Sequence, residues 1–456
     1  MALKNIPMTS LERRSLALLS SIYAMRLTGL FVILPIFALY AHKLKGNTPL
    51  LMGLALGAYG LTQALLQIPS GMLSDRIGRK PVIAGGLIIF AIGSLIAGST
   101  GSIWGVIIGR AIQGAGAISA AIMALVADLT REEQRNKAMA VVGMTIGATF
   151  ILSLTIGPVL DGLIGVPGIF MLTAILSGIA VAVVLFLVPK PVRVLKRQKR
   201  SARADFAKIL TNFQLLRLDA GIFVLHLVMT AIFVVVPQVI VRYLGLGASR
   251  QWELYLPIMV GGFIAMVPFL MMASRKRRTR VVLTGAITLL VVTQLVFYFL
   301  NQTAIGLITG LFLFFAAFSL LEAMLPSLVS RIAPIESKGA AIGVYSSSQF
   351  FGAFTGATLA GALYGAYGIG AVFLATTGLL VVWWILAVTM SEPKLLASRQ
   401  LRVGEQTPSA AEHLARKLSG IPGVAEAIVI AEEGVAYLKI DRHLLDEKSL
   451  EQFAVS

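Results

Sequence analysis

Five ionisable side chains fall inside long apolar stretches of this chain, where a charge needs a partner or a water-lined cavity. They are Arg26, Arg110, Asp161, His226 and Glu322. Because charges are costly in hydrocarbon, such residues mark solute pathways or proton carriers by default. Glu322 is the strongest candidate for a proton carrier, since it lies near the middle of its apolar run. His226 is equally compatible with a polar group satisfied by a neighbouring carbonyl oxygen.

Arg110 opens a polar segment, Arg110-Ala111-Ile112-Gln113-Gly114-Ala115-Gly116, within one of these runs. An arginine keeps its proton at physiological pH, so its expected part is to stabilise the ionised form of a nearby carboxyl group. Polar side chains in the apolar runs can hydrogen-bond a solute, or can equally well join two helices. The candidates for these contacts are Tyr59, Gln63, Gln67 and Gln113.

These residues are carried by twelve apolar runs, each long enough to cross about 30 Å of hydrocarbon with roughly 20 residues. The composition agrees, because 57% of residues are hydrophobic and only 13% are charged, whereas soluble domains carry about a quarter charged residues. The runs cover approximately residues 15–40, 50–72, 81–100, 102–128, 137–164, 168–189, 215–242, 251–273, 281–300, 303–331, 339–364 and 370–390.

The net charge of +18 lies mainly in short loops on one side of these runs. Lys and Arg follow the second, fourth and eighth runs, whereas the loops near residues 101, 166, 302 and 367 carry none. The positive-inside rule then predicts a multi-pass protein of the bacterial inner membrane with both termini in the cytoplasm. We therefore expect the basic loops to face anionic inner-leaflet lipids, and we expect no nucleic-acid partner.

Enzyme chemistry is not expected. The chain has no cysteine, which excludes thiolate metal sites and cysteine nucleophiles. We find no catalytic constellation and no cofactor-binding loop, so neither a cofactor nor a metal site is predicted.

A charged turn, Gly71-Met72-Leu73-Ser74-Asp75-Arg76-Ile77-Gly78-Arg79-Lys80, separates the second and third runs and must lie at the membrane edge. Gly71 is expected to allow a close helix approach, Gly78 a tight turn, and Asp75 is expected to accept hydrogen bonds at a helix end. Arg79 is placed to pair with Asp128 at the end of the fourth run. The alternative for that pair is an ordinary surface salt bridge worth about 0–1 kcal/mol.

The turn G-x-L-x-D-R-x-G-R-K resembles the signature loop of the Major Facilitator Superfamily of secondary transporters. The segment 110–116 resembles the family motif R-x-x-Q-G-x-G. Gly157-Pro158-Val159-Leu160-Asp161-Gly162 resembles the antiporter motif G-P-x-x-G-G, with Asp161 where a glycine is expected. That departure puts tight packing there in doubt and adds a second possible proton carrier.

The resemblance implies two six-helix halves, whose first, fourth, seventh and tenth helices line a central cavity. It implies that the second helix packs beside the eleventh, with Asp75 opposite the positive N-terminal end near Lys338. The charged turn would then act as a conformational latch made of Gly71, Asp75, Arg76, Gly78, Arg79, Lys80 and Asp128. Helix packing would involve Gly114, Gly157, Pro158, Gly162 and, from comparison of the two halves, Gly356.

The expected fold is therefore an all-α polytopic membrane protein with a small α+β domain at its C-terminus. The predicted boundaries are 1–189 and 215–390 for the two halves, 190–214 for a basic linker, 391–403 for a connector and 404–456 for a ferredoxin-like cytoplasmic domain. The linker is compatible with an amphipathic helix on the inner leaflet or with a solvated segment. The acidic tail domain is expected to dock on basic cytoplasmic loops, to self-associate, or to pack on nothing.

We predict a proton-coupled exporter of small molecules that works by alternating access, with Glu322 or Asp161 taking the proton. One alternative is a symporter or facilitator for uptake of a sugar or metabolite on the same fold, because only the motif near Gly157 favours export. The other is a membrane sensor that signals through its tail domain.

Overall fold

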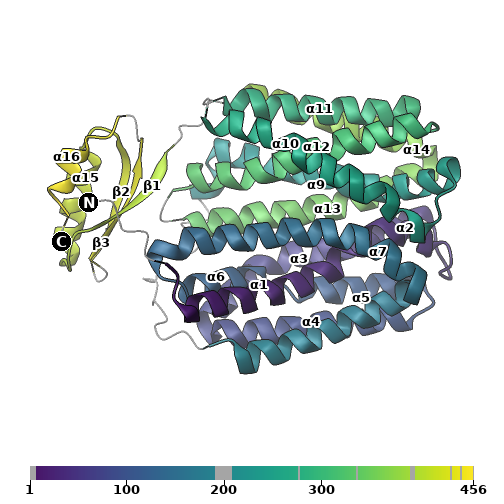
Figure 1. Ribbon diagram of the computed structural model, residues 1–456, viewed down its shortest axis with the longest axis horizontal. Helices are drawn as coiled ribbons and strands as arrows, with labels where there is room; N and C mark the ends of the chain where they lie inside the picture. Colours follow the sequence, from purple (N-terminus) through teal and green to yellow (C-terminus); the bar gives the residue numbers. More distant parts are fainter. Residues whose placement is uncertain are drawn as a thin grey trace.

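The computed structural model describes residues 7–189, 208–275, 278–334, 337–390, 396–431, 434–441 and 444–454. Long helices lie side by side in one bundle, and a small sheet with two helices lies beyond one end of it (Figure 1). We call that end of the bundle the tail-side end and the opposite one the far end.

The bundle is formed by two sets of helices that follow one another along the chain. The first set is α1 (Ser10–Phe31), α2 (Leu34–Ala41), α3 (Pro49–Ile77), α4 (Arg79–Ser99), α5 (Ile103–Ala115), α6 (Ser119–Asp128), α7 (Glu132–Ala182) and the π-turn η1 (Val183–Leu187). The second set is α9 (Phe213–Leu244), the short η2 (Ala248–Arg250), α10 (Trp252–Arg275), α11 (Thr279–Leu300), α12 (Ala304–Ile332), α13 (Lys338–Tyr367) and α14 (Ile369–Val388).

Several helices begin where a side chain caps the free backbone N–H groups of the first turn. The Thr9 hydroxyl accepts from the Glu12 N–H while the Glu12 carboxylate accepts from the Thr9 N–H, which is a complete capping box. Thr48 and Thr303 cap α3 and α12 in the simpler way. Asn212 caps α9, so this helix begins at Phe213, two residues before the predicted start of the second half.

Local interruptions explain why some predicted spans appear as two helices and others as one. The first span is divided into α1 and α2, with Pro35 in the first turn of α2. The predicted spans 137–164 and 168–189 are joined in α7, which bends at Gly165, a residue with φ 67°. A positive φ of this size is readily adopted only by glycine, so the bend falls at that residue.

Ten stretches in the described chain are long and apolar enough to cross a membrane. One of them is the 51-residue stretch Lys137–Leu187, which contains both helical arms on either side of Gly165. The predicted eleventh span, α13, is not among the ten, because its many Gly, Ser and Thr residues lower its hydropathy. The structure therefore shows a helical membrane bundle of this size, and the count of twelve stays a prediction.

The two sets of helices meet most closely where α3 crosses α13. A Cβ atom added at Gly53, Gly57 or Gly60 would overlap backbone atoms of α13. Gly352 and Gly356 bring α13 equally close to the backbone of α9. Small residues thus allow three helices to touch backbone to backbone, as membrane helices commonly do.

The outer surface of the bundle is apolar. Leu65, Phe186 and Phe299 are 65%, 82% and 72% exposed, and many other large apolar side chains also point outward. A soluble domain rarely exposes so many large apolar side chains, whereas lipid tails would cover them.

The tail consists of β1 (Ala397–Arg402), α15 (Pro408–Ser419), β2 (Val424–Ile430), β3 (Val435–Ile440) and α16 (Glu447–Glu451). Its three strands are antiparallel in the order β1-β3-β2. Both helices cover the face of the sheet that points away from the bundle (Figure 1). Leu418, Leu438 and Leu450 are fully buried between them and form the centre of a separate core.

The structure bears on two predicted boundaries, that of the connector before the tail domain and that of the linker between the two halves. Residues 391–403 were expected to be a connector whose last part, 398–403, forms a short strand. β1 lies at that place and pairs along β3, so the sheet already begins at Ala397. Backbone pairing with a distant strand cannot be read from a six-residue segment alone. Of the predicted linker 190–214, residues 190–207 lie outside the described residues. A ferredoxin-like fold for the tail remains a prediction, since the described part contains three strands.

Candidate transport site

The predicted latch forms a compact set of contacts at the tail-side end of the first helices. Arg79 pairs with Asp75 one turn before it, and its Nε lies 3.3 Å from Oδ2 of Asp128 on α6. Arg79 also donates to the Ser74 hydroxyl at 2.7 Å. Gly78 has φ 99°, which explains why a glycine stands at this turn. The guanidinium of Arg79 therefore joins the ends of α3, α4 and α6.

The other latch residues lie around this pair. Lys80 donates to the carbonyl oxygens of Leu185 and Val188, at 3.1 and 2.7 Å, and so holds the end of η1. A Cβ at Gly71 would lie 3.2 Å from Ala120 on α6, and Arg76 is exposed. Asp75 has 53% of its side chain exposed and shows no hydrogen bond or ion pair to the described part of α13. Its predicted contact with the start of α13 therefore stays a prediction.

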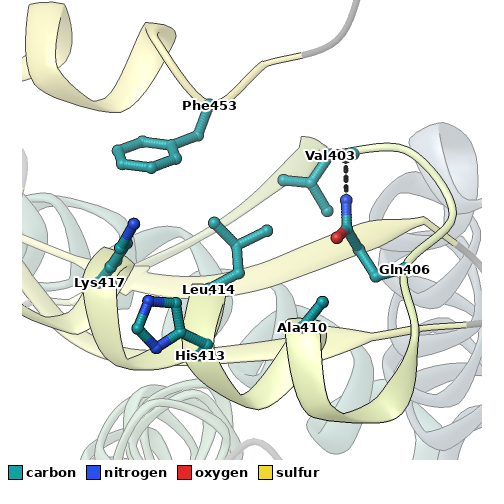
Figure 2. A pocket seen from close by; sticks show the side chains of 7 residues that line it. All are labelled: Val403, Gln406, Ala410, His413, Leu414, Lys417 and Phe453. Atoms are coloured by element: carbon teal, nitrogen blue, oxygen red, sulfur yellow. Dashed lines mark hydrogen bonds between the residues drawn. The ribbon is translucent and has the colours of Figure 1, made fainter.

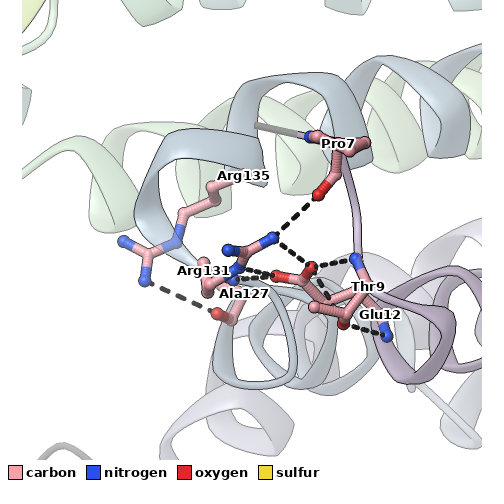
Figure 3. Close-up of polar contacts among 6 residues, drawn as sticks. All are labelled: Pro7, Thr9, Glu12, Ala127, Arg131 and Arg135. Carbon is pink, nitrogen blue, oxygen red and sulfur yellow. Dashed lines mark hydrogen bonds and ion pairs between the residues drawn. The ribbon is translucent and has the colours of Figure 1, made fainter. Parts of the chain in front are cut away.

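A second ion pair, which the sequence reasoning missed, ties α1 to the turn between α6 and α7 (Figure 3). Glu12 is only 4% exposed and accepts three hydrogen bonds from Arg131. Its Oε1 accepts from the backbone N–H and from Nε of Arg131, both at 2.9 Å, and its Oε2 accepts from Nη2 at 3.0 Å. Because Nη2 of Arg131 also donates to the Pro7 carbonyl, the chain before α1 is fastened to the same turn.

We expect Glu12→Gln to lower the free energy of unfolding by about 1–3 kcal/mol, since it removes the charged acceptor of a buried network. The measurement is thermal unfolding of the purified protein in detergent. Glu253→Gln is the matched control, because Glu253 pairs with Arg250 on the surface, where the two side chains are 38% and 65% exposed. Surface pairs are worth about 0–1 kcal/mol. Equal losses in the two variants would show that burial of Glu12 has no special importance.

Glu322, His226 and Gln349 come together from α12, α9 and α13, and we call them the carboxyl cluster. Nε2 of Gln349 lies 2.8 Å from Nε2 of His226 and donates to Oε1 of Glu322 at 3.3 Å. Nε2 of His226 lies 3.9 Å from the second oxygen of Glu322. Among the described residues, that oxygen of Glu322 is buried without a hydrogen-bond donor. The cluster therefore has unused capacity to hold or accept a proton.

Arg26, Arg110 and Tyr59 form a second group in the first half, which we call the arginine cluster. The Tyr59 ring lies between the two guanidinium carbons, 5.6 Å from that of Arg26 and 5.1 Å from that of Arg110. Nη2 of Arg26 donates to Gln63 Oε1 at 2.6 Å, and Nη1 of Arg110 donates to Gln113 Oε1 at 3.1 Å.

The polar residues predicted to contact a solute are all buried around these arginines. Tyr59, Gln63, Gln67 and Gln113 are between 0% and 4% exposed. Gln63 donates onward to Gln67 at 2.7 Å, and Gln113 donates to the Ser94 hydroxyl at 2.7 Å. Gln63 thus links α3 to α1 through Arg26, and Gln113 links α5 to α4 through Ser94, whereas the bond between Gln63 and Gln67 lies within α3.

Asp161 stands apart from both clusters. It lies on α7 beside Gly162, where a Cβ would come within 2.9 Å of Ser249 in η2. Gly157 and Gly114 are packed as closely, against the backbone of Val32 and Tyr59 respectively. Helix packing at this motif is tight even though Asp161 replaces a glycine. Pro158 lies within the same stretch of α7.

The tail touches the bundle at the end of the helix that carries Glu322. The Lys439 ammonium on β3 donates to the carbonyl oxygen of Ala333, the residue that caps the C-terminus of α12. Lys439 is 6% exposed and also lies 3.3 Å from the Glu426 carboxylate on β2. A cation at a helix C-terminus is electrostatically favourable. The contact thus joins the helix-free face of the sheet to α12.

Figure 2 shows a pocket in the tail domain, between α15 and the segment after α16. Its volume is about 300 Å³, and it lies on the side of the sheet that carries the two helices. Its two basic residues, His413 and Lys417, are exposed to solvent. The pocket therefore belongs to the surface of the tail and lies apart from the two clusters in the bundle. Its lining is Val403, Gln406, Ala410, His413, Leu414, Lys417 and Phe453.

Two functional candidates escaped the sequence reasoning. Gln349 sits among small and aromatic residues, and nothing local distinguishes it from other polar residues of α13. Glu12 could have been found from Thr9-x-x-Glu12, which is the pattern of a capping box. Its partner Arg131 lies 119 residues away, so the pair itself had no local signal.

Comparison with known proteins places this geometry in context. The model of the Major Facilitator Superfamily matches residues 17–334 and again 218–431. The Escherichia coli (strain K12) inner membrane transport protein YajR is 41% identical over 446 residues, which cover 98% of each chain. The Escherichia coli tetracycline resistance protein, class E, is 30% identical over 165 residues, covering 35% of this chain and 40% of that one.

A similar fold occurs among solved structures. A bacterial homologue of the human lysosomal transporter Spinster, in an inward-facing and occupied conformation, superposes with a TM-score of 0.67 at 14% sequence identity. The superposition covers 82% of this chain and 95% of that chain.

Proposed function

This chain belongs to the Major Facilitator Superfamily and is a membrane transporter rather than an enzyme, and we propose that it exports small molecules in exchange for protons. The proposed mechanism is alternating access between the two sets of helices. Export is favoured by the glycine-rich motif near Gly157 and by the partial similarity to a tetracycline resistance protein. The similarity to an inner membrane protein supports the same location here. The proposed cytoplasmic position of both termini rests on the basic loops alone.

The carboxyl cluster is the observation that carries the proposal. A protonated Glu322 would no longer attract the Gln349 amide as strongly, and it could itself donate to His226. Gln349 is followed by Phe350, whose ring packs against Tyr59 in the other half, with centroids 6.3 Å apart. A change in protonation in α12 is therefore next to the contact between the two halves.

The latch supports the conformational part of the proposal. In the present conformation the halves touch at the far end, where His42 and Gln238 lie 3.1 Å apart, and along α3 and α13. Within the described residues, Asp75 meanwhile is paired with Arg79. We propose that Asp75 moves to the start of α13 in the alternative state, which would stabilise that state by roughly 0.3–2 kcal/mol.

The test is transport into proteoliposomes with an imposed pH gradient. Tetracycline is a suitable first solute, with an internal pH dye to report proton movement. We expect solute and proton fluxes to be opposite in direction and to stop together when the gradient is collapsed. Solute flux that ignores the gradient would contradict proton coupling, and uptake in place of export in everted vesicles would favour the symporter alternative.

We propose that the tail tunes transport through its contact with α12. The same contact is the observation that supports the alternative, a signalling role for the tail. The tail was expected to dock on the basic linker or on the loop 275–280. Residues 190–207 of the linker and residues 276–277 of the loop lie outside the described residues. The described contact is with the cap of α12 instead.

Because the chain lacks cysteine, this contact can be tested by crosslinking of a double variant, Ala333→Cys with Lys439→Cys. A bifunctional maleimide of lysine length is expected to join the two positions efficiently in membranes. Ala333→Cys with His413→Cys is the control pair, since α15 lies on the opposite face of the sheet (Figure 1). Equal yields for both pairs would mean that the tail has no fixed position on the bundle.

A further inference from the structure

Two arginines lie in the interior of the first half without any acidic partner in the described chain. Arg26 is 0% exposed and Arg110 is 1% exposed. Their hydrogen-bond acceptors are neutral: the amide oxygens of Gln63 and Gln113, and the backbone carbonyl oxygens of Gly116 and Leu56, at distances of 2.6 to 3.4 Å. Two positive charges that lack a counter-charge in a membrane interior are expected to bind an anion, because buried ions are normally paired.

The cluster also holds several hydrogen-bond donors that nothing in the described chain uses. Nε and Nη1 of Arg26 and Nε of Arg110 are buried without a hydrogen-bond acceptor among the described residues. The aromatic faces of Tyr59 and Phe90 attract the guanidinium groups, but they do not satisfy N–H groups in the guanidinium plane. What the cluster lacks is therefore an acceptor with negative charge.

We propose that Arg26 and Arg110 bind the carboxylate of the transported solute, whose apolar or aromatic body lies against Tyr59, Phe90 and Phe350. This inference rests on the proposed transport function and names its substrate class. A guanidinium group offers paired donors that match the two oxygens of a carboxylate, which is the geometry that favours arginine over lysine. The aromatic rings supply the apolar wall that small-molecule sites usually have.

The position of the cluster explains how a solute would reach it. Tyr59 separates the two arginines and also touches Phe350 on α13, which belongs to the other half. The arginines are thus covered by the contact between the halves. Movement of α13 away from α3 would uncover Tyr59 first and the unused donors behind it. The fully buried state of the arginines is then the closed form of the site.

The proposal separates the roles of the two clusters. The carboxyl cluster in the second half would carry the proton, and the arginine cluster in the first half would carry the solute. This assigns Arg26 and Arg110 a role in recognition, whereas the sequence led us to expect Arg110 beside a carboxyl group of the protein.

Binding can be tested with the purified full-length protein, without any gradient. Benzoate and benzamide have the same shape, but only benzoate carries a negative charge. We expect benzoate to raise the midpoint of thermal unfolding in a saturable manner, with an affinity at least tenfold higher than that of benzamide. Equal effects of the two probes would overturn the proposal.

Variants then locate the site. Arg26→Gln and Arg110→Gln are each expected to weaken benzoate binding at least tenfold, and Arg26→Lys, which keeps the charge, is expected to weaken it less. Arg242→Gln is the matched control, because Arg242 also stacks on a tyrosine, at 5.5 Å from the Tyr243 ring, but is exposed. Benzoate binding that survives in both glutamine variants, or that fails equally in Arg242→Gln, would overturn the assignment.

The result of the benzoate experiments can be distinguished from the result of the test of proton coupling. Benzoate binding without gradient-driven flux would leave the anion site intact and refute proton coupling. Gradient-driven flux without preference for benzoate would refute the anion site and leave proton coupling intact.

Discussion

Glu322→Gln is expected to abolish transport against a concentration gradient while downhill exchange of the solute continues. Glutamine has nearly the shape of glutamate and keeps an oxygen that can accept from Gln349, so the packing of α12 against α13 should survive. It cannot, however, take up and release a proton. If Glu322 carries the coupled proton, a pH gradient can no longer drive the solute, and we expect concentrative flux to fall at least tenfold.

The geometry explains why this residue matters more than other acids in the chain. One of its oxygens is buried without a hydrogen-bond partner in the described part of the chain, and Nε2 of the His226 ring lies 3.9 Å from that oxygen. A proton on Glu322 therefore changes the charge of the whole cluster rather than breaking a stable ion pair. Such a change shifts a two-state equilibrium only as far as the two states differ in their affinity for the proton.

Asp161→Asn is the matched comparison, because Asp161 is the second predicted proton carrier and lies on α7, apart from the cluster. We expect this variant to keep its gradient-driven flux within about threefold of that of the parent protein. That change is well below the factor of ten that corresponds to 1.4 kcal/mol. Unchanged flux in Glu322→Gln together with lost flux in Asp161→Asn would transfer the coupling role to Asp161. Loss in neither variant would remove both carboxyl groups from the mechanism.

Features that depend on neighbouring residues were the ones that could be predicted. The turn at Gly78 follows from residue types at a loop that must lie at the membrane edge. The pair between Arg79 and Asp128 joins positions 49 residues apart, and it was expected because both residues lie at ends of apolar runs on the same side of the membrane. The apolar runs likewise predicted most helices, because length and hydropathy are local properties. α13 was also predicted, although its hydropathy is too low for it to count among the ten candidate spans.

Contacts between distant helices were harder to predict. Gln349 joins Glu322 and His226 only because α9, α12 and α13 meet at one point. The neutral partners of Arg110 were not predicted for the same reason. The folded neighbours of a buried cation cannot be identified from its own segment. A short strand was expected at 398–403, but it was placed before the boundary of the tail domain, because its partner strand lies about 40 residues further along the chain.

Gly53→Val is the second variant with a large expected effect, because it acts at the crossing of α3 and α13. A Cβ atom at Gly53 would overlap the Ala357 carbonyl oxygen, and the Gly361 Cα would lie 3.1 Å away. Both obstacles are backbone atoms, which cannot rotate aside as a side chain can. The two helices must therefore move apart, and we expect a loss of about 3 kcal/mol or more in the free energy of unfolding.

Gly57→Ala tests the same crossing with a smaller change. Its Cβ would lie 2.9 Å from the Phe354 carbonyl oxygen, so we expect a smaller but measurable loss even if Gly53→Val fails to fold. Gly85→Ala is the control, since a Cβ there meets nothing within 4 Å and alanine favours the helix. Thermal unfolding in detergent gives the stabilities, and proteoliposome flux gives the activity of the variants that fold.

The crossing also lies between the two halves, so its effect should extend beyond stability. A variant that folds but cannot bring α3 and α13 into backbone contact would lose the closed state, in which Phe350 covers Tyr59 and the arginines. Single cysteines at position 59 are then expected to react faster with a maleimide in Gly57→Ala than in the parent Tyr59→Cys protein. Equal labelling rates would mean that the glycines serve folding alone and that the halves separate elsewhere.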